Sequence, residues 1–113
     1  MKFFQKGDIY QVVRITGPTH NVLGIALADD RESAEITVNE LSLSGQEIRY
    51  LDATAVRDSV MSGVKEGNAR FGTAYRVGRI EFCPSDSPPD DVYRFLAASI
   101  IERLVRGGNF ASQ

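Results

Sequence analysis

The first third of the chain alternates between apolar and polar residues in the way that β-strands do. Residues 8–16 are rich in β-branched and aromatic side chains, which predicts a strand. Residues 21–28 place Leu or Ile at every second position with small residues between them, which indicates a second and more buried strand. Glycine and proline in the stretch 17–21 favour a turn, so the two strands are predicted to form a hairpin.

The middle of the chain has a less regular pattern. Residues 29–33 are polar and predict a turn, and 34–41 ("AEITVNEL") has the composition of a strand. Residues 42–45 ("SLSG") indicate another turn, and 46–51 ("QEIRYL") is typical of either a short strand or the approach to a helix. The pattern therefore predicts one strand between residues 34 and 51 and leaves a second one open.

A helical period begins after this segment. Valines recur at every fourth position over residues 53–66, which predicts an amphipathic helix, and Asp52 is a favourable N-cap for it. Gly67 and Asn68 are expected to end the helix. Gly63 costs about 1 kcal/mol relative to alanine inside a helix, so it indicates either a close approach of another backbone or a frayed last turn.

A strand and a second helix complete the pattern. Residues 72–82 predict a strand whose alternation slips near Gly78, which indicates a bulge. The stretch "CPSDSPPDD" then joins this strand to an apolar stripe with helical spacing, and Ser87 and Pro88 are expected to cap and start that helix. Gly107 and Gly108 are expected to end it.

The order of elements is β-β-(β)-α-β-α. A single sheet with both helices on one face buries both apolar stripes, so we predict an α+β fold, a two-layer sandwich. The length of 113 residues fits a single domain over 1–113. Its ordered core is expected over about 8–106, with 107–113 as a loose tail.

Composition narrows the functional classes. Hydrophobic residues make up 42% and charged residues 25%, as in ordinary globular proteins, and the net charge is −2. The chain lacks the excess of basic residues that indicates nucleic-acid binding. No apolar run approaches the roughly 18 residues of a membrane span. The N-terminal residues lack the pattern of a secretory signal, and the single cysteine forms no internal disulfide, so a cytoplasmic location is expected.

Few residues carry an indication of chemistry. Cys83 and His20, the only cysteine and histidine, both lie at predicted strand ends and would have to meet to form a nucleophile and its base, but a structural thiol is the more common role. The acids Asp86, Asp90 and Asp91 do not have the spacing of a calcium loop. Residues 17–21 lack the frame of a phosphate-binding loop. We therefore predict no catalytic residue, metal or cofactor.

Two groups of residues are candidates for binding. Basic residues interleaved with an aromatic can hold a nucleic-acid backbone and stack a base, although a solvated turn accounts for the same pattern. The RNA-binding candidates are Lys65, Arg70, Phe71 and Arg76, with His20 as a second contact.

The second group concerns the last helix. Phe95 lies off its apolar stripe, near Val92, and these two are the candidates for a protein-binding surface. Cover by the C-terminal tail or by residues 39–51 is an equal alternative.

Several stretches in this order carry a family resemblance. They are "HNVLGIAL" (20–27), "AVRDSVMSGVKEGNARFG" (55–72), "YRVGRIEF" (75–82), Asp86-Ser87 and "YRFLAASI" (93–100). Together they resemble the fourth domain of translation elongation factor G and its tetracycline-protection relatives, over about residues 9–104. The resemblance implies a split β-α-β sandwich with a left-handed crossover, against the usual right-handed preference. It also implies contact with RNA or a ribosome-associated surface.

The chain departs from that family in two loops. Residues 17–21 stand where the family has a longer glycine-rich loop, and the chain passes directly from Phe82 through Cys-Pro-Ser without the family's histidine-containing turn. Both loops lie at or near the tip with which the family probes the ribosomal decoding centre, so the resemblance implies the fold more strongly than the function.

Three hypotheses follow. The first is a noncatalytic binding domain that resembles the elongation factor G domain and binds RNA. The acidic pI of 5.3 disfavours this hypothesis. The second is a protein-binding module, such as a bacterial inhibitor, immunity or accessory protein, or a homodimer formed through a sheet edge. The third is an enzyme using Cys83 or His20. We expect a binding domain, with a protein or RNA partner and no membrane contact.

Overall fold

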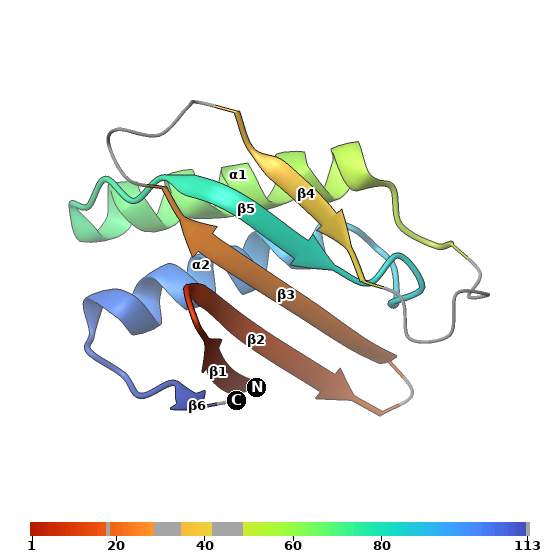
Figure 1. The fold of residues 1–113 in the computed structure, drawn as a ribbon, viewed down its shortest axis with the longest axis horizontal. Helices are drawn as coiled ribbons and strands as arrows, with labels where there is room; N and C mark the ends of the chain where they lie inside the picture. The colour runs from red at the N-terminus through yellow and green to blue at the C-terminus, as the bar shows by residue number, and fades with distance from the viewer. Residues whose placement is uncertain (18, 29–34, 42–48, 113) are drawn as a thin grey trace.

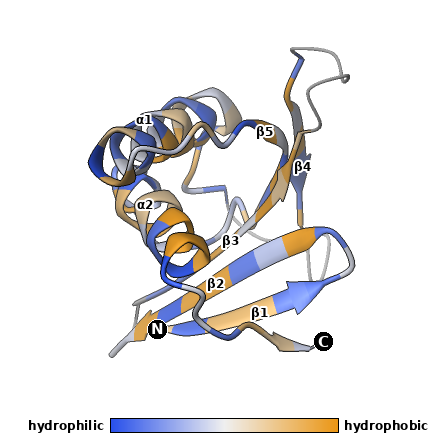
Figure 2. Ribbon diagram, turned by 90° about the vertical axis from the view of Figure 1, so that its left-hand side faces the viewer, coloured by the Kyte–Doolittle hydropathy of each residue, from blue (hydrophilic) through white to orange (hydrophobic). Residues whose placement is uncertain are grey.

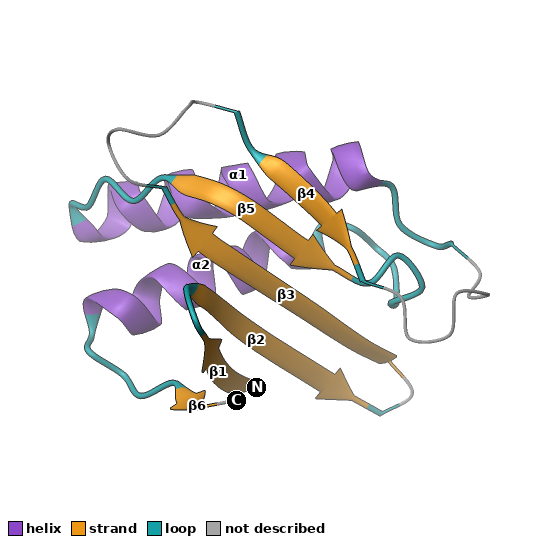
Figure 3. Cartoon of the chain, viewed as in Figure 1, coloured by secondary structure: helices purple, strands orange, loops and turns teal. Residues whose placement is uncertain are grey.

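The computed structural model describes residues 1–17, 19–28, 35–41 and 49–112. The elements are β1 (Lys2–Lys6), β2 (Ile9–Thr16), β3 (Thr19–Leu27), β4 (Thr37–Glu40), α1 (Ala53–Phe71), β5 (Val77–Phe82), α2 (Val92–Val105) and β6 (Ala111–Ser112). The strands form one sheet in the order β4-β5-β3-β2-β1-β6 (Figure 1). Both helices pack on the same face, and no helix of the described residues covers the opposite face (Figures 2 and 3). The predicted two-layer α+β sandwich is therefore confirmed.

The β4-α1-β5 connection is a left-handed crossover. β4 and β5 are parallel neighbours in the sheet. In Figure 1 both strands run from left to right with β4 above β5, and α1 returns behind the sheet between them. Figure 2 shows the helices on that same side. This path turns to the left, whereas nearly all such connections turn to the right.

The central hairpin and its irregular neighbour agree with the pattern. β2 and β3 pair antiparallel around a tight turn, from Ile9 opposite Ala26 to Thr16 opposite Thr19. β3 then pairs antiparallel with β5, and its register shifts where Leu27 pairs with Val77 after Ala26 pairs with Arg79. Gly78 is therefore the extra residue, and the predicted bulge is confirmed.

Two short strands at the ends of the chain were not predicted. β1 pairs antiparallel with β2 through a two-residue turn at Gly7-Asp8, where Gly7 has a φ of 59°. Adjacent phenylalanines between lysines give no alternation, and the Gly-Asp turn was the available signal. The expected loose tail is also corrected, because β6 pairs with β1 and Phe110 packs edge-on against Phe3 and Tyr10.

The segment between β3 and α1 contains β4, so a strand is confirmed within the predicted stretch 34–41. Of the possible second strand over 46–51, residues 46–48 lie outside the described residues, and residues 49–51 are not in a strand. The turns predicted at 29–33 and 42–45 lie outside the described residues as well.

Helix α1 begins as predicted and ends later. The Asp52 carboxylate accepts the backbone N–H of Ala55 at 3.0 Å, which confirms the N-cap. The predicted end at Gly67 is wrong, because the helix continues to a left-handed cap at Gly72. Gly67 lies inside the helix and packs on Ile101. Gly63 is packed more closely still, because a Cβ added there would lie 2.1 Å from the Arg94 carbonyl oxygen. The close-approach explanation of Gly63 is the correct one.

Helix α2 begins later than predicted. Ser87 and Pro88 were expected to cap and start it, but its first helical residue is Val92. The backbone N–H of Ser87 instead donates to the carbonyl of His20, and its hydroxyl accepts the N–H of the same residue. These bonds tie residue 87 to β3, so a tertiary contact overrides the local capping signal.

The core lies between the sheet and the helices. Its largest fully buried side chains include Tyr93, Phe82, Leu23, Ile25, Ile80, Leu96, Ile100 and Ile101. The helical stripe predicted for α2 supplies half of them. Within the described part of the chain, no helix is both long and apolar enough to cross a membrane.

Candidate functional site

The outer surface of the helical layer is shaped by two glycines of α1. Without side chains there, the two helices come close: the carbonyl of Arg94 lies over Gly63, and Ile101 packs on Gly67. Because residues 63 and 67 of α1 face residues 94 and 101 of α2 in the same order, the helices run in the same direction. They begin at one end of the molecule and end at the other (Figure 1).

A hollow lies between the helices on this surface. Its volume is about 160 Å³. It is lined by Glu66, Gly67, Arg70 and Phe71 of α1 and by Phe95, Ala98, Ser99 and Glu102 of α2. We call this hollow the interhelical groove. The Phe95 residue is 55% exposed, although phenylalanine side chains are mostly buried in folded proteins.

Ion pairs frame the interhelical groove. Arg94 pairs with Glu66 across the two helices, and Arg106 pairs with Glu102 at 3.1 Å along α2. The hydrogen bond from Arg94 lowers the pKa of the Glu66 carboxyl. The groove thus has an aromatic interior and a rim of fixed charges.

Phe71 forms the far wall of the groove together with two cations. The guanidinium of Arg70 lies 5.0 Å from the centre of its ring, and that of Arg106 lies 5.9 Å from it. Stacking of this kind contributes about 0.5–1 kcal/mol at exposed sites. Both arginines therefore already contact an aromatic ring of their own chain.

The groove unites candidates that the sequence had assigned to two different sites. Arg70 and Phe71 came from the predicted RNA-binding set, and Phe95 came from the predicted protein-binding surface. Val92 does not join them, because its side chain is partly buried against the hydrophobic core. The signal that sequence analysis missed was the Gly63-Gly67 pair, which brings α2 against α1.

Lys65 and Arg76 lie on the other side of α1. They line a second, more open hollow of about 380 Å³, whose walls are formed by Ile36, Met61, Val64, Asn68, Tyr75 and Val77. The amide of Asn68 is used within the turn that follows α1, since it bonds both backbone groups of Tyr75 and the hydroxyl of Thr73. The four basic and aromatic RNA-binding candidates are thus divided between two hollows.

His20 lies at the opposite end of the sheet from these residues. It is the second residue of β3, where its backbone bonds Ser87 of the 83–91 loop, whereas Lys65 and Arg70 belong to the second half of α1 and Arg76 follows that helix. Its Nε2 lies 3.0 Å from Oδ1 of Asp86. A joint RNA site of His20 with these cations is therefore not formed.

Asp86 is the centre of a buried polar cluster. It is 1% exposed, and its Oδ2 accepts the backbone N–H of Val22 at 2.9 Å. The hydroxyl of Tyr93 lies 3.5 Å from the same oxygen, and the amide of Asn21 bonds the Ser87 carbonyl. Burial raises the pKa of the Asp86 carboxyl and outweighs the opposing effects of Val22 and His20. Burial likewise raises the pKa of Tyr93.

This cluster holds the fold together at one end. It joins the start of β3, the 83–91 loop and the first turn of α2, which explains the burial of the polar residues Asn21 and Asp86.

Cys83 precedes this cluster and is partly buried, and its carbonyl accepts the N–H of Asp86. Among the residues that the structure describes, no group of three or more histidine, cysteine or acidic side chains is arranged to hold a metal ion.

No family model, curated protein or solved structure matches the chain.

Proposed function

We propose that this chain is a noncatalytic protein-binding domain that docks its partner on the interhelical groove. The observation that carries the proposal is the exposed ring of Phe95 on a groove that also contains Phe71. Aromatic anchors surrounded by charged residues are the usual centre of a protein interface. A partner with one apolar side chain to insert and charged groups beside it fits this arrangement.

The distribution of charge supports a protein partner over RNA. Among the described residues, several arginines are engaged with carboxylates of the same chain, namely Arg49 with Glu40, Arg79 with Asp8, Arg94 with Glu66 and Arg106 with Glu102. RNA binding draws on cations that are available to phosphates, and the net charge of the chain is −2.

The position of two further arginines supports the same proposal. Arg70 lies in the last turn of α1 and Arg103 in the last turn of α2. Helix C-termini carry a partial negative charge, which favours these cations but disfavours an approaching phosphate. The basic end of the helical layer is accordingly less attractive to RNA than its number of arginines implies.

Site-specific photo-crosslinking tests the proposal. A photoreactive phenylalanine analogue replaces Phe95 in one version of the chain and Ile15 in another, and each is irradiated in native extract of the source cell. Ile15 is 70% exposed on the β2–β3 hairpin, so it is a matched exposed apolar position away from the groove. We expect one protein to be captured at a fixed ratio from position 95 and not from position 15.

A substitution completes the design. Phe95→Ala is expected to abolish capture of that protein by the tagged chain, with a change of less than about 1 kcal/mol in the free energy of unfolding, because the side chain is largely exposed. Equal capture from positions 95 and 15, or capture that persists after Phe95→Ala, would contradict the proposed function.

The left-handed crossover favours a second candidate function. The β4-α1-β5 connection has the uncommon hand that the resemblance to the fourth domain of elongation factor G implies. On this alternative the partner is RNA or a ribosome-associated surface, contacted through Lys65 and Arg76. RNase treatment of the extract distinguishes the two functions: ribosomal proteins that disappear with RNase support the alternative, and a partner indifferent to RNase supports the protein-binding function.

A further inference from the structure

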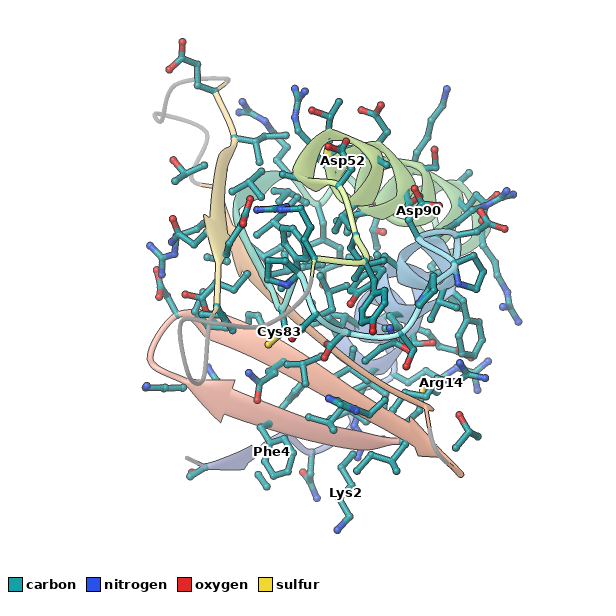
Figure 4. All side chains as sticks on the ribbon, turned by 90° about the vertical axis from the view of Figure 1, so that its right-hand side faces the viewer. Lys2, Phe4, Arg14, Asp52, Cys83 and Asp90 are labelled. Carbon is teal, nitrogen blue, oxygen red and sulfur yellow. The ribbon has the colours of Figure 1, made fainter. Side chains whose placement is uncertain are left out.

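The two ends of the helical layer carry opposite charge. Where the helices begin, four aspartates stand against two arginines on the helices, their caps and the residue before the α2 cap: Asp52, Asp58, Asp90 and Asp91 against Arg57 and Arg94. Figure 4 shows Asp52 and Asp90 together at this end, on the helix side of the molecule. Where the helices end, the helical layer has four cations against two acids: Lys65, Arg70, Arg103 and Arg106 against Glu66 and Glu102. Lys65 and Arg103 lie at the two sides of this layer, beside the second hollow and over the Phe3 ring of β1.

The helix dipoles reduce this difference without removing it. Each helix contributes roughly half a positive charge at its start and half a negative charge at its end. Both helices point the same way, so about one unit is subtracted from an excess of two at each end. The helical layer remains acidic at one end and basic at the other.

We propose that the occupant of the interhelical groove is a second copy of this chain, packed helix face to helix face with its helices antiparallel. This inference rests on the proposed function, because it names the partner of the same groove. An antiparallel arrangement places the acidic end of each copy over the basic end of the other. A parallel arrangement places like charges together, which opposes association.

The spacing along α2 defines the arrangement. A twofold axis that crosses α2 between Ala98 and Ser99 places Asp91 of one copy opposite Arg106 of the other, since these residues are equally distant from it. The same operation carries Phe95 of each copy to the level of Glu102 in the other. Glu102 and Phe71 line that end of the groove, so Phe95 is the knob and the groove is the hole. Each copy supplies both, as an isologous interface requires.

The size of the face indicates a weak dimer. With about 1.5 Å of rise per residue, α2 is roughly 21 Å long and α1 roughly 28 Å long. Two such helices side by side offer a face that buries on the order of 1,000 Å² in total, the lower limit of specific interfaces. We therefore expect a dimer that forms in the micromolar range and weakens as salt is added.

The sheet edges are less suited to pairing of copies. The terminal strands are β4, with four residues, and β6, with two, so each edge offers few backbone groups to a second chain. The homodimer expected from the sequence through a sheet edge is replaced in this proposal by one through the helices.

Sedimentation of the purified chain tests the proposal. Runs from about 5 µM to about 500 µM, which span the affinities of weak dimers, are compared for the wild type and four variants. Asp91→Arg and Arg106→Asp are each expected to weaken dimerisation about tenfold, because each replaces two attractive contacts by two repulsive ones. The two changes in one chain restore attraction across the interface and are expected to return the dissociation constant to within about threefold of the wild type.

Lys6→Asp is the control for charge reversal, since Lys6 belongs to β1 on the sheet and is expected to leave dimerisation unchanged. Thermal unfolding confirms that each variant is folded. A purified chain carrying the photoreactive analogue at position 95 is expected to crosslink to residues 99–106 of a second copy. A chain that stays monomeric throughout, or a double variant no better than the single ones, overturns the proposal.

The outcome also separates this inference from the proposed function. A monomeric chain that still captures another protein through position 95 overturns self-association and leaves the protein-binding function standing. A chain that neither dimerises nor captures a partner through position 95 overturns both.

Discussion

Nε2 of His20 lies 3.0 Å from Oδ1 of Asp86, and the two residues differ greatly in exposure: the histidine side chain is 58% exposed and the aspartate side chain 2%. The contact joins the β2–β3 hairpin to the loop before α2. It lies beside the backbone bonds between His20 and Ser87 that replace the predicted cap at the start of α2. Asp86 is consequently the residue whose removal reports most directly on this end of the fold.

Asp86→Ala is expected to lower the free energy of unfolding by about 2–4 kcal/mol. The substitution leaves the buried N–H of Val22 and the hydroxyl of Tyr93 without their acceptor, and each such loss costs about 1–3 kcal/mol. Urea unfolding followed by circular dichroism measures the effect. Asp58→Ala, at an exposed position of α1, is the control and is expected to change stability by less than about 0.5 kcal/mol. Equal effects of the two changes would contradict a structural role for Asp86.

The raised pKa of Asp86 predicts a dependence of stability on pH. Burial favours the protonated carboxyl in the folded state, so the folded pKa lies above the usual 3.8. The folded chain then binds more protons than the unfolded chain between the two values, and the stability that protonation contributes is lost as the pH rises through the folded pKa.

This dependence is measured in a chain that already carries His20→Ala, which removes the charge of the imidazole from the comparison. The free energy of unfolding of His20→Ala, relative to His20→Ala with Asp86→Asn, is expected to fall as the pH is raised from about 3.8. A relative stability that rises instead would mean that hydrogen bonding to the carboxylate dominates burial.

Gly63→Ala is expected to destabilise the protein by about 2–4 kcal/mol, because an alanine Cβ would lie 2.1 Å from the carbonyl oxygen of Arg94 and force the helices apart. On an isolated helix the same change stabilises by about 1 kcal/mol, so the sign of the effect is informative. Ser62→Ala, the neighbouring exposed position, is the control and is expected to be neutral or slightly stabilising. A stabilised Gly63→Ala protein would disprove the close packing of α1 on α2.

Phe110→Ala is expected to cost about 1–2 kcal/mol, because the ring packs edge-on against Tyr10 at 5.0 Å and Phe3 at 5.8 Å. Thermal unfolding measures the loss. Asn109→Ala is the matched control, since Asn109 contributes its backbone carbonyl to Arg103 and its side chain is not needed for that bond. No difference between the two variants would return residues 107–112 to the status of a loose tail.

The predictable parts of the fold are those in which one local signal acts alone. The alternation in β2 and β3, the Asp52 cap and the slip at Gly78 each leave a pattern among neighbouring residues of the sequence, and each was confirmed. The end of α1 was mistaken because Gly67 is a common helix terminator, while its actual role is a contact with Ile101 on another helix. Periodicity carries no information about such a contact.

The candidate site was predictable as residue types but not as a place. Arg70, Phe71 and Phe95 were singled out for their chemistry, yet nothing in their spacing showed that they line one groove. The separation of His20 from the cations was equally hidden. The residues of a site come from elements far apart in sequence, and the packing of those elements decides which of them meet.

The sequence by itself determined the class of the fold, because periods of 2 and 3.6 residues state which face of each element is buried, and two helices with a sheet have one economical way to bury those faces. Only the tertiary structure decided the hand of the β4-α1-β5 crossover, the start of α2 and the groove between the helices. Each of these depends on contacts between residues far apart in sequence. Examples are the hydrogen bond from the Val22 backbone to Asp86 and the close packing of Gly63 on the backbone of Arg94. Local propensities amount to about 1 kcal/mol per residue, and such buried contacts exceed them.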